Sequence, residues 1–232
     1  MTAGGAPTPD ASASGIIRVR IRRYAPLDRA AIRAICCDTA NRGKPLDPLL
    51  SDRELAADLL TRYYTDDDPT ATWVAGVGGR VIGYLTGCLD TQRYEQLMSR
   101  RVVPQAVMEA IGRGALASSQ AWRFVGAGLQ TWVRGGFGPH APLKRFPAHL
   151  HVNIRQGFRG QEVGRRLVER FVLQARTAGV DGVHARVRGD NPAACRFFEA
   201  LGFRALRRHP VVWPDGAGYL AHEAVLYGRP LS

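Results

Sequence analysis

The sequence has almost no lysine and no long hydrophobic run. Lys44 and Lys144 are the only lysines among 32 basic residues, so a net charge of +12 comes from arginine. These arginines are scattered and accompany no nucleic-acid-binding motif, so we expect no nucleic-acid partner. No apolar stretch approaches the roughly 18 residues that a membrane-spanning helix needs. We therefore expect a soluble, cytoplasmic protein with no membrane partner.

Cysteines are also few, which argues against a disulfide framework or a zinc site. The four are Cys36, Cys37, Cys88 and Cys195, without a CxxC pair or a histidine at zinc spacing. We expect reduced, mostly buried thiols and no metal cofactor. Residues 1–15 lack the basic start and apolar run of a secretory signal, and their Gly, Pro and Ser content predicts a disordered tail.

Residues 16–232 have the composition of an ordinary globular protein and are predicted to form one α/β domain. Gly78-Gly79 joins two β-rich runs and is typical of a hairpin, while start signals at Pro26 and Ser51 predict helices. Asn191 and Pro192 predict another helix start, and Gly202 its end. The expected strands are 16–23, 70–77, 80–88, 149–154, 182–187, 203–208 and 219–227, and helices are expected at 160–178 and 192–201.

A helical insertion is predicted at about 90–145. Apolar residues repeat at helical spacing twice, at Val103, Val107 and Ile111 and then at Trp122, Val125, Leu129 and Trp132. Packing of these side chains against the body of the domain is the simpler interpretation. A lid over an acceptor pocket is the alternative.

The segment 149–167 is the most informative about function. His149, His151 and Asn153 share one face of a predicted strand whose other face is apolar. A covered central strand should be apolar on both faces, so this polar stripe predicts a cleft. The strand continues through a glycine turn into a helix whose first N–H groups can bind a phosphate. Close helix packing is the alternative role of Gly160 and Gly164.

This segment resembles the acetyl-CoA motif of the GNAT superfamily of N-acetyltransferases, Arg/Gln-x-x-Gly-x-Gly/Ala. The matching residues run from Arg159 to Gly164, and a second landmark of the family is similar to Asn191, Phe197-Phe198 and Gly202-Phe203. The resemblance spans about 16–227, with 90–145 as the insertion. The strand from His149 is most similar to a subgroup that includes domains related to the C-terminal part of O-GlcNAcase.

The resemblance implies a mixed, mostly antiparallel sheet flanked by helices and splayed into a cofactor cleft after Ile154 and Val187. The pantetheine arm of acetyl-CoA would bind the backbone of Val152 and Ile154, and the pyrophosphate would bind the amides of 160–164. The residues expected to bind the cofactor are Val152, Asn153, Ile154, Arg159, Gly160, Gln161, Glu162, Val163, Gly164, Arg165 and Asn191.

The implied reaction is acetyl transfer to a small-molecule or peptidic amine by direct attack on the thioester. His149 and His151 are the candidate catalytic residues, because histidine titrates near neutral pH and can accept a proton. A histidine pair hydrogen-bonded within the fold is the alternative. Tyr84 and Asp90 are candidates for orienting the acceptor. Many relatives are dimers, so a homodimer is one candidate assembly, and the sequence leaves the oligomeric state open.

Two positions depart from the family pattern. Glu162 stands where glycine is preferred, and its carboxylate would crowd the phosphates. Phe198 stands where a tyrosine often protonates the departing thiolate. A catalytically silent module that binds or senses acetyl-CoA or CoA is therefore the alternative function.

Overall fold

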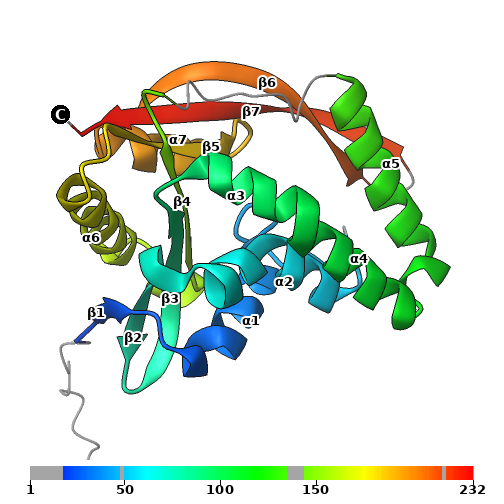
Figure 1. The fold of residues 1–232 in the computed structure, drawn as a ribbon, viewed down its shortest axis with the longest axis horizontal. Helices are drawn as coiled ribbons and strands as arrows, with labels where there is room; N and C mark the ends of the chain where they lie inside the picture. Colours follow the sequence, from blue (N-terminus) through cyan, green and yellow to red (C-terminus); the bar gives the residue numbers. More distant parts are fainter. Residues whose placement is uncertain (1–17, 48–49, 135–143, 216–217, 232) are drawn as a thin grey trace, which may run out of the picture.

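A computed structural model describes residues 18–47, 50–134, 144–215 and 218–231 (Figure 1). Its seven-stranded sheet has the order β1-β2-β3-β4-β5-β7-β6, and β4 with β5 is its one parallel pair. This mixed, mostly antiparallel sheet flanked by helices confirms the predicted fold class. The strands are β1 (Arg20–Arg23), β2 (Trp73–Val77), β3 (Arg80–Cys88), β4 (Ala148–Ile154), β5 (Gly182–Arg188), β6 (Arg204–Asp215) and β7 (Gly218–Pro230).

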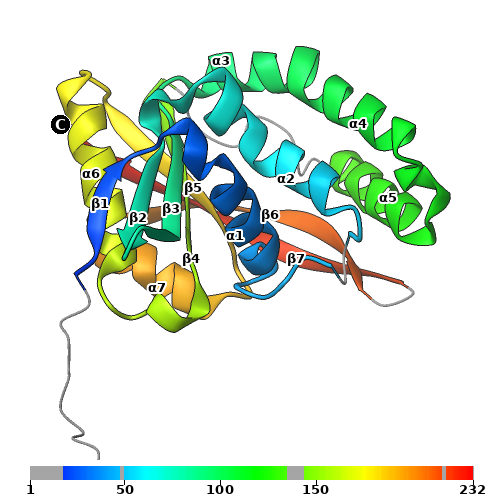
Figure 2. The same ribbon diagram turned by 90° about the horizontal axis from the view of Figure 1, so that it is seen from below.

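Helices cover both faces of the sheet. Figure 2 shows α6 and α1 on opposite sides of β2 to β4. The longer helices are α1 (Arg29–Thr39), α2 (Arg53–Arg62), α3 (Thr91–Leu97), α4 (Val103–Gly112), α5 (Ser119–Val133), α6 (Val163–Thr177) and α7 (Pro192–Ala200). Short helical turns are η1 (Pro26–Asp28), η2 (Tyr63–Asp67), η3 (Pro69–Ala71), η4 (Met98–Val102), η5 (Ala115–Ala117) and η6 (Gln156–Phe158). None of these described helices combines the length and apolar character needed to cross a membrane.

The main core lies between α6 and the sheet. Leu167 and Phe171 of α6 pack with Leu150 of β4 and Val183 of β5, all of them buried. The apolar face of β4 is thus used for packing, as its alternation predicts. Its polar face is directed to the other side of the sheet, where α1 and α2 lie.

Local start and stop signals were predicted well. Gly78 and Gly79 both have positive φ in the β2–β3 hairpin. Asn191 caps α7 by accepting a hydrogen bond from Ala194 N (3.2 Å), and Gly202 follows the helix at φ 79°. These three predictions are confirmed. The predicted tail 1–15 and the first residues of the predicted strand 16–23 lie outside the described residues.

The start of α2 differs from the prediction. Asp52, not Ser51, caps the helix and accepts a hydrogen bond from Leu55 N (3.0 Å). Leu60 of this helix is 43% exposed. A polar contact occupies the interface of α1 and α2 instead, because Arg33 donates to the buried Asp58 (2.6 Å).

The packing expected for the insertion is wrong for its large apolar residues. Trp122 and Leu129 of α5 are 61% and 58% exposed, and Val103, Val107, Ile111 and Val125 are exposed as well. The buried residues of these helices are small, such as Ala106, Ala110 and Ala127. Small side chains let a helix approach its neighbours closely. The alanine-bearing face of each helix is therefore the face that packs against the rest of the protein. The side chain of Trp132 lies outside the described part of the chain.

Helix α5 is fastened to the edge of the sheet through one hydroxyl. Thr131 Oγ1 donates to Val212 O (3.3 Å) and accepts from Val212 N (2.9 Å) on β6. In both views α5 lies against the far part of the β6–β7 hairpin (Figures 1 and 2). The opposite edge of the sheet is β1, which has four residues.

Candidate active site

β4 and β5 pair briefly and then separate. Their parallel register consists of Ala148 with Val183 and His149 with His184. β4 stays paired with β3 from His149 opposite Cys88 to Ile154 opposite Gly83. The C-terminal part of β4 therefore has one open edge, which faces the split between the two strands.

The register shows which backbone groups face this split. Arg155 N donates to Ile82 O (2.9 Å), in register with Ile154 opposite Gly83. Backbone groups of an antiparallel strand alternate in direction, so the odd-numbered residues bond to β3. Beyond the short pairing with β5, Val152 and Ile154 consequently direct their N–H and C=O groups into the split. Arg159 Nε donates to Ile154 O (2.9 Å), in agreement with this direction.

A cavity of about 430 Å³ lies between the end of β4, the turn before α6, and α7. Gly160 in this turn has φ 75°, a left-handed conformation that glycine adopts without strain. Ten of the predicted cofactor residues line the cavity: Val152, Asn153, Ile154, Arg159, Gly160, Glu162, Val163, Gly164, Arg165 and Asn191. The other predicted residue, Gln161, is exposed and donates to Gly157 O (3.2 Å).

Glu162 faces a neighbouring arginine. Its Oε2 lies 2.6 Å from Arg165 Nε, and its side chain is 68% exposed. Its backbone is strained, because φ is 58° in a residue that is not glycine. The expected crowding of the phosphates by Glu162 stays a prediction.

The donors and the space of this cavity fit a diphosphate. The first N–H groups of α6 have no intrahelical acceptor, and the helix dipole favours an anion there. Arg42, Arg159 and Arg165 contribute three cations to the lining, against one carboxylate. A Cβ on Gly164 would lie 3.2 Å from the Phe197 ring, so this position has little room for a side chain.

A second cavity of about 270 Å³ adjoins the first and shares Val152, Asn153, Asn191 and Phe198 with it. Its polar lining comes from both sides of the split and from helices above the sheet. Further lining residues include Tyr64, Tyr84, Thr86, Tyr94, His151, Arg186 and Arg188. This cavity is the candidate acceptor side of the site.

His149 is held within the fold. Its Nε2 lies 2.7 Å from Tyr64 Oη and its Nδ1 lies 2.8 Å from Thr91 Oγ1. The residue is 5% exposed. Burial, with the nearby His151 and His184, lowers the pKa of His149 well below 6.5. Both ring nitrogens are therefore engaged, and the geometry favours a positioning role.

His151 is open to the cavity. It lies two residues along the same face of β4, and its side chain is exposed. The surrounding protein and the charge of Arg186 lower the pKa of His151 to about 4. The imidazole is thus neutral at pH 7, with a lone pair available for a proton.

The two candidates for orienting the acceptor have different surroundings. Tyr84 lines the second cavity but is buried, and its Oη accepts from Asn153 Nδ2 (2.7 Å). Asp90 caps α3 by accepting from Arg93 N (3.0 Å) and is not among the lining residues of either cavity. Both roles stay predictions.

Phe198 lines both cavities and is buried among Phe203 and Tyr227. It has no proton to donate. Tyr64 and Tyr94 bring phenols to the second cavity from η2 and α3, and burial raises the pKa of each. Both phenols stay protonated at neutral pH.

Sequence reasoning missed Tyr64, Tyr94 and Arg186. The two tyrosines reach the site through long-range packing, which has no local signal. Arg186 had a local signal, because it follows His184 by two residues on β5 and so shares its face of the strand. The same alternation that singled out His149 and His151 applies to this strand.

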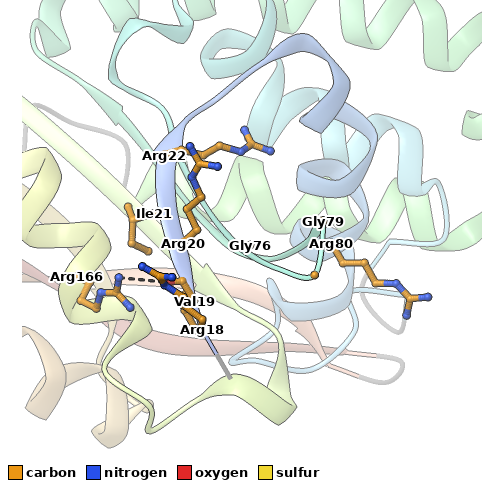
Figure 3. Close-up of a pocket in the computed structure, with 10 residues that line it drawn as sticks. Arg18, Val19, Arg20, Ile21, Arg22, Gly76, Gly79, Arg80 and Arg166 are labelled. Carbon is orange, nitrogen blue, oxygen red and sulfur yellow. Dashed lines mark hydrogen bonds between the residues drawn. The ribbon is translucent and has the colours of Figure 1, made fainter. Parts of the chain in front are cut away.

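A groove of about 720 Å³ along β1 is a separate feature (Figure 3). Its charged lining consists of Arg18, Arg20, Arg22, Arg80 and Arg166, with Arg166 Nη2 donating to Val19 O (3.1 Å). The lining holds no histidine, carboxylate or thiol that could transfer a proton near neutral pH. The split between β4 and β5 is therefore the better candidate for an active site. Within the described ranges, no group of three His, Cys, Asp or Glu residues could hold a metal ion.

Comparison with known proteins agrees with this placement. Residues 128–203, which include β4, α6 and α7, match the model of the acetyltransferase (GNAT) family. The structure of SsHAT is similar at 22% identity and a TM-score of 0.65, covering 92% of this chain and 98% of that one.

Two further structures have the same fold. One is yncA from Salmonella typhimurium, described as an acetyltransferase and solved with its cofactor acetyl-CoA, at 16% identity and a TM-score of 0.57, covering 92% of this chain and 94% of that one. The other is a ribosomal-protein-alanine N-acetyltransferase from Brucella melitensis, at 18% identity and a TM-score of 0.55, covering 91% and 99%. The resemblance to the O-GlcNAcase-related subgroup stays a prediction. The chain has the GNAT acetyltransferase fold, and its residues 128–203 carry the sequence pattern of that family.

Proposed function

We propose that the chain is an acetyl-CoA-dependent N-acetyltransferase that acts on an amine. The observation that carries this proposal is the open edge of β4, which faces the split beside the first turn of α6. An open strand edge can bind an extended amide-bearing chain such as pantetheine, and a helix N-terminus can bind its diphosphate. The family match and the acetyl-CoA held by yncA support this assignment.

Different residues would bind different parts of acetyl-CoA. The backbone of Val152 and Ile154 faces the split, and Val152 C=O with Ile154 N–H would bind the pantetheine arm, which leaves Val152 N–H for the thioester. The amides of 160–164 would bind the pyrophosphate, with Arg159 and Arg165 adding charge-assisted contacts. Asn191 lines both cavities and would contact the cofactor from α7.

Acetyl-CoA supplies a thioester: an amine attacks its carbonyl carbon, the C–N bond forms, the C–S bond breaks, and the sulfur leaves with the electron pair. Val152 N–H would stabilise the charge on the carbonyl oxygen. His151 would accept the amine proton, directly or through water, since it is neutral at pH 7 and open to the cavity. Tyr94 or water would protonate the sulfur in place of the tyrosine that Phe198 replaces.

A catalytically silent module that binds acetyl-CoA is the second candidate. Phe198 is the observation that favours it, because this ring occupies the wall of both cavities without an acidic proton. Glu162 also places a carboxylate at the phosphate side. Both features would weaken catalysis or affinity without closing the split.

Calorimetric titration with acetyl-CoA, followed by thiol release over a panel of amines, tests both candidates. We expect saturable binding and release of thiol that depends on the amine. Binding without turnover on any amine would favour the silent module. Absence of binding would contradict both functions.

A further inference from the structure

We propose that the acceptor amine carries an anionic group, a carboxylate or a phosphate, and that Arg186 binds it. This inference rests on the proposed acetyl transfer and specifies its acceptor. Arg186 lies on β5 beyond the point where the strands separate. It lines the acceptor cavity of about 270 Å³.

The strand register places Arg186 on the side of the sheet that holds the candidate base. His149 pairs with His184 in the parallel register, so their side chains share a face. Alternation then puts His151 on β4 and Arg186 on β5 on that same face, two residues beyond this pair. The charge of Arg186 contributes to the low pKa of His151, which agrees with their proximity.

Neighbouring arginines have carboxylate partners. Arg188 donates to both oxygens of Asp190 (3.0 and 2.9 Å), and Arg42 pairs with the same residue (3.2 Å). For Arg186, in contrast, the described part of the chain provides no hydrogen bond or ion pair. Glu95 on α3 is the nearby acid, but it is exposed and forms no ion pair with Arg186.

The guanidinium of Arg186 is accessible to a ligand, because the residue is exposed on β5 and lines the acceptor cavity. The protein around Arg186 lowers its pKa, so an anion beside it would favour the charged form. A guanidinium binds a carboxylate or a phosphate through two parallel hydrogen bonds. An anionic acceptor would supply the partner that the described chain does not.

The space beside Arg186 suits a small group. A further cavity of about 110 Å³ adjoins it, lined also by Thr91, Tyr94, Glu95, His149, Leu150, His151 and His184. At about 30 Å³ for each water in the liquid, this is room for roughly four water molecules. A carboxylate or phosphate with one or two carbons fits such a volume, whereas a folded polypeptide does not. An anion held there would keep the attached amine near His151.

Matched acceptor pairs test this proposal with the full-length protein. The carboxylate pairs each consist of an amino acid and its amide. The phosphate pairs each consist of an aminoalkyl phosphate and the corresponding amino alcohol. We expect kcat/KM for one of the anionic classes to exceed that of its neutral partner at least about tenfold. This is the range of a charged hydrogen bond.

Arg186→Gln should lower kcat/KM about 10- to 100-fold for the anionic acceptor and less than about threefold for its neutral partner. Arg186→Lys should restore part of the preference, because it keeps the charge but not the bidentate geometry. Arg80→Gln is the matched control. It removes a positive charge from the groove in Figure 3 and should leave kcat/KM unchanged for both acceptors.

Equal rates on the charged and neutral members of every pair would overturn the proposal. An equal loss of kcat/KM for both members of a pair in Arg186→Gln would also overturn it, because Arg186 would then contact the thioester and not the acceptor. If no amine is acetylated, the proposed function fails. Binding then tests the role of Arg186 by itself. Ligand-observed NMR compares N-acetylglycinate with its neutral partner N-acetylglycinamide in the presence of the CoA-saturated protein. Binding of the carboxylate form that is lost in Arg186→Gln supports this role, and equal or absent binding of the two forms rejects it.

Discussion

Two histidines on one face of β4 illustrate how neighbours decide the role of a residue. Strand alternation correctly predicted that His149 and His151 share a face. It could not predict that Tyr64 and Thr91, both distant in the sequence, engage the ring of His149. No hydrogen bond from the described residues engages the ring of His151, which lines the acceptor cavity. The sequence therefore identified the pair, and tertiary contacts separate its members.

His151→Ala should lower kcat about 10²- to 10⁴-fold, the usual contribution of a general base, with an unchanged Kd for acetyl-CoA. His149→Gln should instead lower the free energy of unfolding by about 1–3 kcal/mol, because the buried Tyr64 hydroxyl loses its partner. Steady-state kinetics, calorimetry and urea unfolding measure these effects. Similar losses of kcat in both variants would contradict this division of roles.

Glu162→Gly should stabilise the protein by about 1 kcal/mol, because glycine adopts φ 58° without strain. It should also tighten acetyl-CoA binding, since Arg165 loses its nearer carboxylate partner, keeps only the 4.0 Å contact with Glu169, and can turn to a phosphate. Thermal unfolding and calorimetry measure the two effects.

Glu162→Ala is the control that separates charge from backbone strain. It removes the carboxylate but keeps a Cβ in the left-handed region. We expect tighter cofactor binding in both variants and a higher Tm in the glycine variant alone. A Tm increase of the same size in both would show that strain at residue 162 is not the cause.

At the scale of elements, most sequence signals with a local cause were reliable, although the cap of α2 lies one residue after the predicted one. The hairpin at Gly78-Gly79 and the cap at Asn191 each depend on a few neighbouring residues, and the structure has them where expected. The α4–α5 segment was misjudged because its apolar residues repeat at helical spacing on an exposed side. Which side of a helix packs depends on its partners, and here alanine and Thr131 face them.

The first turn of α6 offers the sharpest test of the cofactor cradle. Gly164→Leu should abolish acetyl-CoA binding while the fold is kept, because its side chain would fill space next to Phe197. Gly157→Leu is the matched control, since a Cβ there meets no atom within 4 Å. Calorimetry and circular dichroism distinguish the two effects. Retained affinity in Gly164→Leu would show that the cofactor binds elsewhere.

At the scale of the whole molecule, the neutral histidines of the split link stability to pH. Surrounding protein lowers the pKa of His149, His151 and His184 below 6.5, to about 4 for His151. Below pH 6.5 the unfolded chain binds protons at these positions, whereas the folded chain does not. Unfolding then takes up protons, so stability falls as the pH falls.

Urea unfolding should therefore give a lower free energy of unfolding at pH 5 than at pH 7. The slope with pH should be smaller in His184→Gln, which removes one of the groups concerned. A flat dependence between pH 7 and pH 5 would contradict the low pKa values. Lowered carboxyl pKa values, such as that of Asp28, act below this window and do not confuse the comparison.

The candidate homodimer stays a prediction, and α5 offers a place for it. Trp122, Val125 and Leu129 expose apolar area on this helix. If a second copy covers that face, Leu129→Glu should weaken self-association, while Arg80→Gln should not. Sedimentation equilibrium measures both, and a monomeric wild-type protein would contradict the prediction.

The two edge strands of the sheet affect the tendency of the protein to aggregate at high concentration. An unpaired edge strand can recruit a strand from another molecule and start aggregation. At β6, the Thr131 hydroxyl already occupies both backbone groups of Val212, and at β1 the strand is short and rich in arginine. Thr131→Val would free that pair of groups, so Thr131 can act as a guard against polymerisation as well as a tether for α5.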